Sequence, residues 1–274
     1  MAQINSSDVA KLRNMTGAGM MDCKKALEES DGDFEKAIDV LRKKGQKVAM
    51  NRAERDAKEG VVLAKASADN KTGVLIVLNC ETDFVAKTDK FVTFAQDIVE
   101  IALAGKVSNL DALKDQPYKG LKINDEVINQ NGVIGEKIDL AHYDILEAEY
   151  VATYIHAGNK LATMVAFNKV LDSQLAKDVA MQVAAMSPIA VDKGDVPQSV
   201  IDKEVEIGKE LARQEGKPED MLEKIALGRL NKFYQEATLL NQTSVKENKL
   251  TISQVLANAD KDIKVLGFKR YSLK

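Results

Sequence analysis

The feature that most constrains the fold is a strand–turn–strand–helix pattern that occurs twice. Two runs rich in β-branched and aliphatic residues, Val61 to Ala66 and Val74 to Leu78, flank a polar turn and predict a β-hairpin. The same order returns at Val151 to His156 and Leu161 to Phe167. A two-stranded hairpin is not stable alone and needs a helix across one face. The pattern therefore predicts an α+β core in two parts.

An amphipathic helix is expected after each hairpin. The first follows a Thr88 cap, and in both helices apolar residues recur at steps of three and four. These positions are Phe91, Phe94, Ala95, Ile98, Val99 and Ala102 in the first helix, and Leu175, Ala176, Val179, Ala180 and Val183 in the second. Further along, we expect a short helix near residues 253–258 and a strand near residues 264–271 that rejoins the second sheet.

Two helical parts are expected outside this core. Three short runs of helical spacing between Ser7 and Lys44 predict a compact three-helix module. Two charged runs joined by Gly216-Lys217-Pro218 predict an antiparallel helical hairpin that projects from the body. Its seam is expected to pair Ile201, Val205, Leu211 and Ala212 with Leu222, Ile225, Ala226 and Phe233.

These patterns divide the chain into five expected parts. They are the three-helix module (1–45), a basic linker (46–59), the first core subdomain (60–140), the second core subdomain (141–197 and 238–274) and the inserted helical hairpin (198–237). The segment from Arg42 to Lys58 contains seven Lys or Arg residues against two acidic ones and few apolar residues. We interpret it as a solvated helical linker.

Composition and motifs argue against several classes of function. A net charge of −3 indicates no chain-wide electrostatic surface for nucleic acid, so we expect no direct nucleic-acid binding. Cys23 and Cys80 lack the spacing of a zinc or redox site and are expected to be buried, reduced thiols. The sequence has no Walker loop, nucleophile elbow or His-rich cluster, so we expect no cofactor, no metal and no bond-breaking chemistry.

The expected location is the cytoplasm. The N-terminal stretch MAQINSSDVAKL lacks the apolar core of a signal peptide. No later stretch has the roughly 18 apolar residues that a membrane helix requires, so no membrane association is expected.

The segment NCETDFV, from Asn79 to Val85, is unusual because carboxylates stand beside a bulky aromatic residue where a strand leads into a helix. Its local chemistry supports two interpretations. The first is an ordinary helix cap with Phe84 buried, since strand-to-helix loops commonly contain Asp or Thr caps. The second is a protein-binding wedge.

Three separate segments resemble the bacterial elongation factor Ts family. They are TGAGMMDCKKALEESDGDFEKAI within Leu12 to Leu41, LNCETDFVA at Leu78 to Ala86, and EGKPEDMLEKIALGRLNKF at Glu215 to Phe233. Their order and spacing also match, and the likeness includes His156 and the GFKRY stretch near the end. The resemblance therefore covers nearly the whole chain. It implies that the N-terminal three-helix module is ubiquitin-associated-like.

The resemblance implies a guanine-nucleotide exchange factor that acts on elongation factor Tu, a translational GTPase. In the family, a TDFV segment reaches the partner's nucleotide and magnesium site, and it is matched here by Thr82, Asp83, Phe84 and Val85. The N-terminal module docks on the GTPase domain, at positions matched by Arg13, Met20, Met21 and Lys24. His156 matches a residue that supports this contact, although a histidine in a hairpin is also commonly structural.

Other functions stay open at this level. A non-exchange adaptor would use the same modules only to bind proteins. An RNA-binding protein would use Arg42 to Lys58 and show strongly salt-dependent affinity. A small-molecule enzyme would need polar residues that converge in a pocket, which the sequence does not reveal. The helical hairpin is a candidate for self-association or for contact with the partner. Members of the family with a further C-terminal helix make a contact that is not carried over to this sequence, which reaches Lys274 shortly after the last expected strand.

Overall fold

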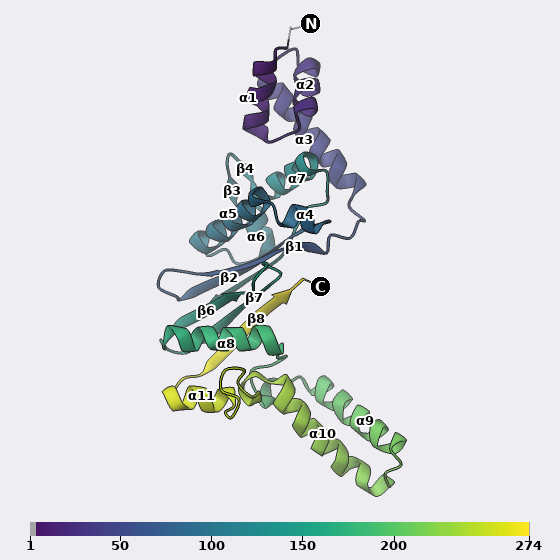
Figure 1. Cartoon of the computed structure of the whole chain (residues 1–274), viewed down its shortest axis with the longest axis vertical. Coiled ribbons are helices and arrows are strands. Elements are labelled where there is room, and N and C mark those ends of the chain that lie inside the picture. Colours follow the sequence, from purple (N-terminus) through teal and green to yellow (C-terminus); the bar gives the residue numbers. More distant parts are fainter. Residues whose placement is uncertain (1–3, 274) are drawn as a thin grey trace.

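The computed structural model of the chain describes residues 4–273 and is elongated (Figure 1). A three-helix unit lies at one end, two stacked sheets with their helices form the middle, and a pair of long helices projects at the other end (Figure 1). The outermost parts of the first and last expected domains, residues 1–3 and residue 274, lie outside the described residues.

The N-terminal unit confirms the three predicted helices, which are α1 (Ser6–Thr16), α2 (Met20–Glu29) and α3 (Phe34–Asn51). Side-chain oxygens of Asn5 and Asp33 cap the first and third helices. The small core contains Leu12, Cys23 and Leu27, all fully buried. The likeness of this unit to a ubiquitin-associated domain stays a prediction.

The third helix continues past this unit and packs on α7 (Ile123–Ile134) of the middle region. The two helices touch where glycines face each other, since a Cβ atom added to Gly132 would lie 2.6 Å from the Cα of Gly45. The helical part of the Arg42 to Lys58 prediction is confirmed only as far as Asn51. Most of the segment is exposed, as expected of a solvated linker, whereas Gly45 is buried against α7.

The first sheet contains the first predicted hairpin, which is confirmed. Its strands are antiparallel in the order β1-β2-β5, with bounds β1 (Glu59–Ala66), β2 (Thr72–Cys80) and β5 (Asp139–Glu147). The expected helix is α5 (Asp89–Gly105), capped by Thr88, and all six of its predicted apolar positions are buried. The third strand, β5, was not predicted.

The second sheet repeats this arrangement and also confirms its predicted elements. Its strands are antiparallel in the order β6-β7-β8, with bounds β6 (Tyr150–Ile155), β7 (Leu161–Phe167) and β8 (Val265–Ser272). The expected helix is α8 (Ser173–Met186), and the short helix before the closing strand is α11 (Ile252–Ala259). Four of the five predicted apolar positions of α8 are buried, and Leu175 is partly buried.

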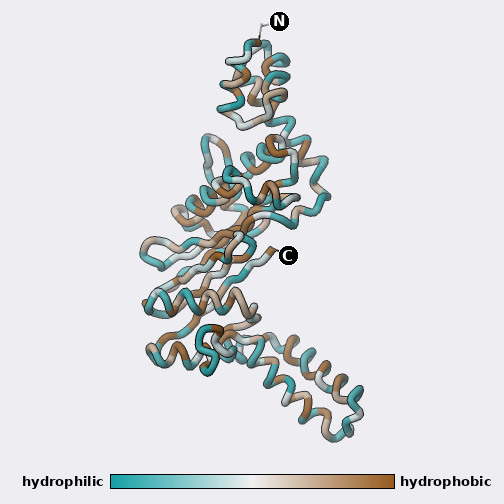
Figure 2. The backbone as a smooth tube through the Cα atoms, in the orientation of Figure 1, coloured by the Kyte–Doolittle hydropathy of each residue, from teal (hydrophilic) through white to brown (hydrophobic). Residues whose placement is uncertain are grey.

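The two sheets pack face to face, and their helices cover the outer faces. Alternate residues of β1 and β2 point to opposite sides, so Val61 and Ile76 pack with α5 while Val62 and Val77 face the second sheet. Met164 of β7 lies in the shared inner layer. Figure 2 shows apolar residues concentrated along these central strands, whereas the connecting loops are largely hydrophilic. The two-part α+β class is therefore confirmed.

The helical hairpin consists of α9 (Gln198–Gln214) and α10 (Leu222–Ala237), which project from the second sheet as predicted (Figure 1). Ala212, Leu222 and Ala226 are buried in its seam. The prediction for Leu211 is wrong, since its side chain is 41% exposed. Buried Gly208 lies four residues before Ala212 on one helical stripe, and Leu211 is rotated about 60° from Gly208 and about 100° from Ala212.

Smaller elements complete the described chain. They are α4 (Asp83–Ala86), α6 (Leu110–Lys114), β3 (Pro117–Tyr118), β4 (Leu121–Lys122), and the 3₁₀ turns η1 (Lys193–Asp195), η2 (Glu219–Met221) and η3 (Leu239–Asn241). None of the helices in residues 4–273 combines the length and apolar character needed to cross a membrane.

Candidate functional site

The TDFV segment, Thr82 to Val85, lies where β2 leads into the one-turn helix α4. The hydroxyl oxygen of Thr82 accepts a hydrogen bond from the N–H of Val85 at 3.4 Å, so Thr82 is the helix cap that its sequence position predicts. Of the two interpretations of this segment, the one with a buried Phe84 is wrong, because this residue is 81% exposed. Ala86 is the buried residue of α4, and Phe84 lies two positions before it, about 200° around the helix. The segment thus presents an aromatic ring to solvent.

The carboxylate of Asp83 next to this ring is stabilised in its charged form. The Nζ atom of Lys87 donates a hydrogen bond to Oδ2 of Asp83 at 2.6 Å, one helical turn later. This hydrogen bond, together with the positive charge of Lys160, lowers the pKa of Asp83 below its ordinary value. A negative charge therefore stands beside the exposed ring of Phe84 at neutral pH.

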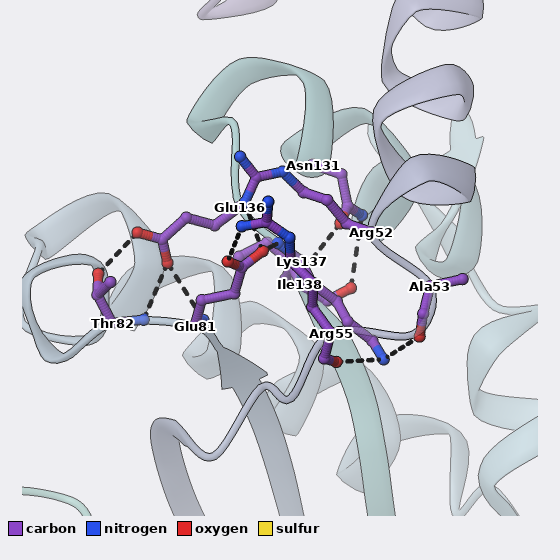
Figure 3. Close-up of polar contacts among 9 residues, drawn as sticks. All are labelled: Arg52, Ala53, Arg55, Glu81, Thr82, Asn131, Glu136, Lys137 and Ile138. Atoms are coloured by element: carbon purple, nitrogen blue, oxygen red, sulfur yellow. Dashed lines mark hydrogen bonds and ion pairs between the residues drawn. The ribbon is translucent and has the colours of Figure 1, made fainter.

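Glu136 holds the beginning of this segment (Figure 3). Its Oε2 atom accepts hydrogen bonds from the backbone N–H groups of Glu81 and Thr82, at 3.1 Å and 3.0 Å. Its Oε1 atom accepts a third from the hydroxyl group of Thr82, at 2.7 Å. The Glu136 carboxylate thus accepts three hydrogen bonds from Glu81 and Thr82, the two residues immediately before Asp83.

Glu81 makes a second, neighbouring set of contacts (Figure 3). Its side chain, only 14% exposed, accepts hydrogen bonds from Arg52 at 2.6 Å, from Arg55 at 3.2 Å and from the backbone N–H of Lys137 at 2.6 Å. Burial opposes the charged form, but the Lys137 N–H and the two guanidinium groups outweigh it and lower the pKa of Glu81. The segment is therefore tied to the chain just after α3.

The thiol of Cys80, at the end of β2, is fully buried as predicted. Burial, followed by the negative charge of Glu136, raises the pKa of this thiol to about 12. Cys80 is therefore a neutral packing residue at physiological pH and does not supply a nucleophile.

The turn between β6 and β7 lies at the same edge of the molecule. The N–H of Val62 in β1 donates to the carbonyl oxygen of Asn159 at 2.6 Å, and Lys160 pairs with Glu59 at 2.7 Å. His156 precedes this turn with its side chain exposed, and its Nδ1 atom is 2.9 Å from the hydroxyl oxygen of Tyr154. The two hairpins therefore bring the TDFV segment and the second-hairpin turn to one edge.

The N-terminal candidates form a separate surface. Arg13, Met20, Met21 and Lys24 are all exposed, with Met20 at 57% and Met21 at 63%. Sequence reasoning missed Met15, which is also exposed on α1 and could have been noticed as a third methionine close to the TGAG turn. These residues lie on α1 and α2, above α7 and α4 in Figure 1, so the structure does not join them to the TDFV segment.

A cleft of about 570 Å³ separates the N-terminal unit from the first sheet's helices. Its walls include Met15 and Arg42 on one side and Phe94, Tyr118 and Val133 on the other. Within residues 4–273, no three or more His, Cys, Asp or Glu side chains are grouped as metal ligands. Beside the cleft, the two regions are joined by α3, which packs on α7, and by Val133 of α7, which packs against the N-terminal core.

These elements define an α+β protein of two packed three-stranded sheets, with a three-helix N-terminal unit and a projecting helical hairpin. A family model described as elongation factor TS matches residues 81–274, from the start of the TDFV region onward. The chain is 49% identical to the elongation factor Ts of Christiangramia forsetii and 50% identical to that of Cytophaga hutchinsonii, with all of each chain covered. It is 48% identical to that of Flavobacterium psychrophilum, again over the full length of both chains.

The chain belongs to the elongation factor Ts family. The family model begins at residue 81, whereas the relatives also cover the N-terminal helices.

Proposed function

We propose that the chain is a guanine-nucleotide exchange factor that accelerates release of GDP from elongation factor Tu. Membership of the elongation factor Ts family supports the proposal. The structural observation that carries it is the exposed ring of Phe84, beside the charged Asp83, on a backbone held by Glu136. A large apolar side chain held out into solvent is typical of a protein-binding surface.

The energetic problem of exchange is large. A GTPase that binds its nucleotide with nanomolar affinity holds it by roughly 12 kcal/mol. An exchange factor lowers this affinity only by binding the nucleotide-free GTPase more tightly than the loaded one. By linkage, nucleotide binding weakens the factor equally, so arriving GTP displaces it.

In this proposal Phe84 acts as the wedge. Burial of an aromatic side chain removes roughly 150–250 Å² from water, which at about 25 cal/mol per Å² supplies roughly 4–6 kcal/mol toward deforming the partner. Asp83 places a negative charge near the magnesium and phosphate groups of the partner and disfavours their coordination. Thr82 caps the segment, and the partly buried side chain of Val85 packs it on the first core.

The other predicted contact residues act as docking groups in the same proposal. Arg13, Met20, Met21 and Lys24 bind the GTPase domain through the N-terminal unit, and methionine suits such a surface because its side chain adapts to its partner. His156 supports the TDFV contact from the neighbouring turn. The proposed module boundaries are those predicted from the sequence, with the helical hairpin as a further surface for the partner or for a second copy.

The proposed activity includes no bond-making or bond-breaking step and requires no cofactor of the chain itself. Its proposed location is the cytoplasm, and it involves no direct contact with nucleic acid.

The test is release of fluorescent GDP from purified elongation factor Tu on addition of the chain and excess unlabelled GDP. Substoichiometric chain should accelerate release of the whole labelled population, because each molecule is displaced and acts again. Binding without accelerated release would contradict the proposal and favour the non-exchange adaptor. The control without the chain gives the intrinsic release rate.

A further inference from the structure

The one-turn helix that carries Phe84 cannot hold its own orientation. A single turn has too few internal hydrogen bonds to be stable in water, since nucleation of a helix is unfavourable. Of the TDFV side chains, Val85 packs partly on the core and Phe84 points outward. Ala86 anchors the far end of α4 in the first core, and the direction of the ring depends on that contact together with the bonds that fix the chain just before Asp83.

Those bonds join two short segments, Glu81-Thr82 and Glu136-Lys137, each of which accepts backbone hydrogen bonds from the other. Glu136 accepts both backbone N–H groups of Glu81 and Thr82, and Glu81 in return accepts the backbone N–H of Lys137. The Nζ atom of Lys137 donates to two carbonyl oxygens beyond α3, those of Ala53 at 2.6 Å and Arg55 at 3.0 Å. Three distant stretches of sequence thus meet at one polar cluster (Figure 3).

The position of Glu136 is itself fixed. Gly135, with a φ of 81°, ends α7 in the left-handed conformation, and its N–H bonds the carbonyl oxygen of Asn131 at 2.9 Å. The buried Asn131 side chain accepts the N–H of Ile138 at 2.8 Å and so holds the next strand. Glu136 lies between these two anchors, in the short loop that joins α7 to β5.

We propose that Glu136 is a positioning residue for nucleotide exchange. It fixes the TDFV segment, so that Phe84 and Asp83 are already oriented before the partner binds. This inference rests on the proposed exchange function. Preorganisation matters because ordering a mobile segment on binding costs free energy, and that free energy is then not available to deform the partner's nucleotide site. A purely structural role for Glu136 is the competing explanation.

The orientation itself can be measured without any partner. The chain contains no tryptophan, so Phe84→Trp supplies a single indole at the position in question. In this background Glu136→Ala should lower the fluorescence anisotropy of the indole in the folded protein, while circular dichroism stays unchanged. Glu136→Gln should largely restore the anisotropy, because an amide oxygen accepts the two N–H groups and the amide nitrogen donates to the Thr82 hydroxyl.

The matched control is Glu149→Ala, which removes another carboxylate, paired with Lys71 at 3.1 Å, beyond the opposite end of β5. It should leave the anisotropy unchanged. If Glu136→Ala disturbs the fold, Thr82→Val provides a smaller change, since it removes only the Thr82 hydroxyl, which contacts Glu136 at 2.7 Å and caps α4 at 3.4 Å. Unchanged anisotropy in the folded Glu136 variant, or in Thr82→Val if that variant must replace it, would overturn the proposal.

The exchange assay, with Phe84 retained, separates positioning from stability. Glu136→Ala should lower the maximal rate of GDP release by about tenfold, as expected when hydrogen bonds to a charged group are lost. The concentration for half-maximal effect should change less than about twofold, because docking through α1 and α2 persists, and Glu136→Gln should recover most of the rate. An unchanged maximal rate, or failure of Glu136→Gln to recover it, would overturn the positioning role. A wild-type chain that does not accelerate release would instead refute the exchange function, while the anisotropy still reports whether Glu136 orients the segment.

Discussion

Replacement of Gly132 by alanine should separate α3 from α7. The added Cβ atom would lie 2.6 Å from the Cα and 3.0 Å from the N atom of Gly45, both of which belong to the backbone of α3. Favourable carbon–carbon contacts lie at about 3.5–4.0 Å, so the helices must move apart by about 1 Å. Such overpacking costs about 1–3 kcal/mol.

A second glycine variant isolates this steric cost. Gly228 lies inside α10, where an added Cβ would have no neighbour within 4 Å. Both variants gain about 1 kcal/mol from the higher helix propensity of alanine. Gly228→Ala should therefore stabilise its helix by about that amount, and Gly132→Ala should be about 1–3 kcal/mol less favourable than Gly228→Ala.

Urea unfolding gives the stabilities of the two variants, and native-state hydrogen exchange locates the change. In Gly132→Ala, the amides of α3 beyond Gly45 and those of α7 should lose protection, whereas those of α5 should keep it. Equal stabilisation by the two substitutions, with unchanged exchange in α3, would refute the glycine contact as the junction between the N-terminal unit and the first sheet's helices.

Three further predictions follow from burial and charge. Phe84→Ala should change the free energy of unfolding by less than about 0.5 kcal/mol because the ring is exposed. Phe91→Ala leaves a cavity at a buried site and should lower the free energy of unfolding by about 3–5 kcal/mol. Equal urea midpoints for the two variants would contradict this difference in burial. The folded-state pKa of Glu81 is lowered, so its charge stabilises the fold above its ordinary pKa of 4.5, and this stabilisation is lost as pH falls through the folded-state pKa. The difference in unfolding free energy between wild type and Glu81→Gln should therefore become smaller from pH 6 to pH 3. A difference that stays constant over this range would contradict the stabilising role of the Glu81 charge. Burial raises the pKa of the Cys80 thiol to about 12 and also raises the pKa of the Cys23 thiol. A disulfide reagent at pH 8 should therefore react with neither thiol until urea unfolds the protein. Rapid labelling of the folded protein would contradict the burial of these thiols.

Local periodicity was enough to predict much of the fold. The apolar positions after Thr88 recur at helical spacing, and all six are buried on one face of α5. The two hairpins were equally clear, because β-branched runs flank a short polar turn. In each case the information lies within about 20 neighbouring residues.

Elements that depend on distant partners could not be predicted in this way. β5 carries His142 and Asp144 among its apolar residues, and it becomes a strand by pairing with β2, about 60 to 75 residues earlier. The junction of α3 with α7 depends on two glycines that look like ordinary helix weakeners until they face each other. The seam error at Leu211 came from favouring a large apolar residue over the smaller Gly208 on the correct stripe.

The candidate site shows the same division. Thr82 was recognisable as a cap from its position between strand and helix. Local chemistry favoured burial of Phe84, and only resemblance to the family favoured an exposed wedge, which agrees with the exposed ring. Glu136 was missed because it lies 54 residues from Thr82 and no local pattern joins them. The functional roles of the TDFV residues, the N-terminal contact residues and His156 stay predictions.

The most direct test of the central claim is the maximal rate of GDP release from elongation factor Tu with the double variant Asp83→Ala/Phe84→Ala. Both side chains are at least partly exposed, so the variant should fold like the wild type by circular dichroism and urea unfolding. The proposed wedge predicts that the rate of stimulated release falls by at least about tenfold. This fall is equivalent to an activation free energy of GDP release that is higher by about 1.4 kcal/mol or more. Release as fast as with the unmodified chain, at saturating concentrations of both, would contradict it.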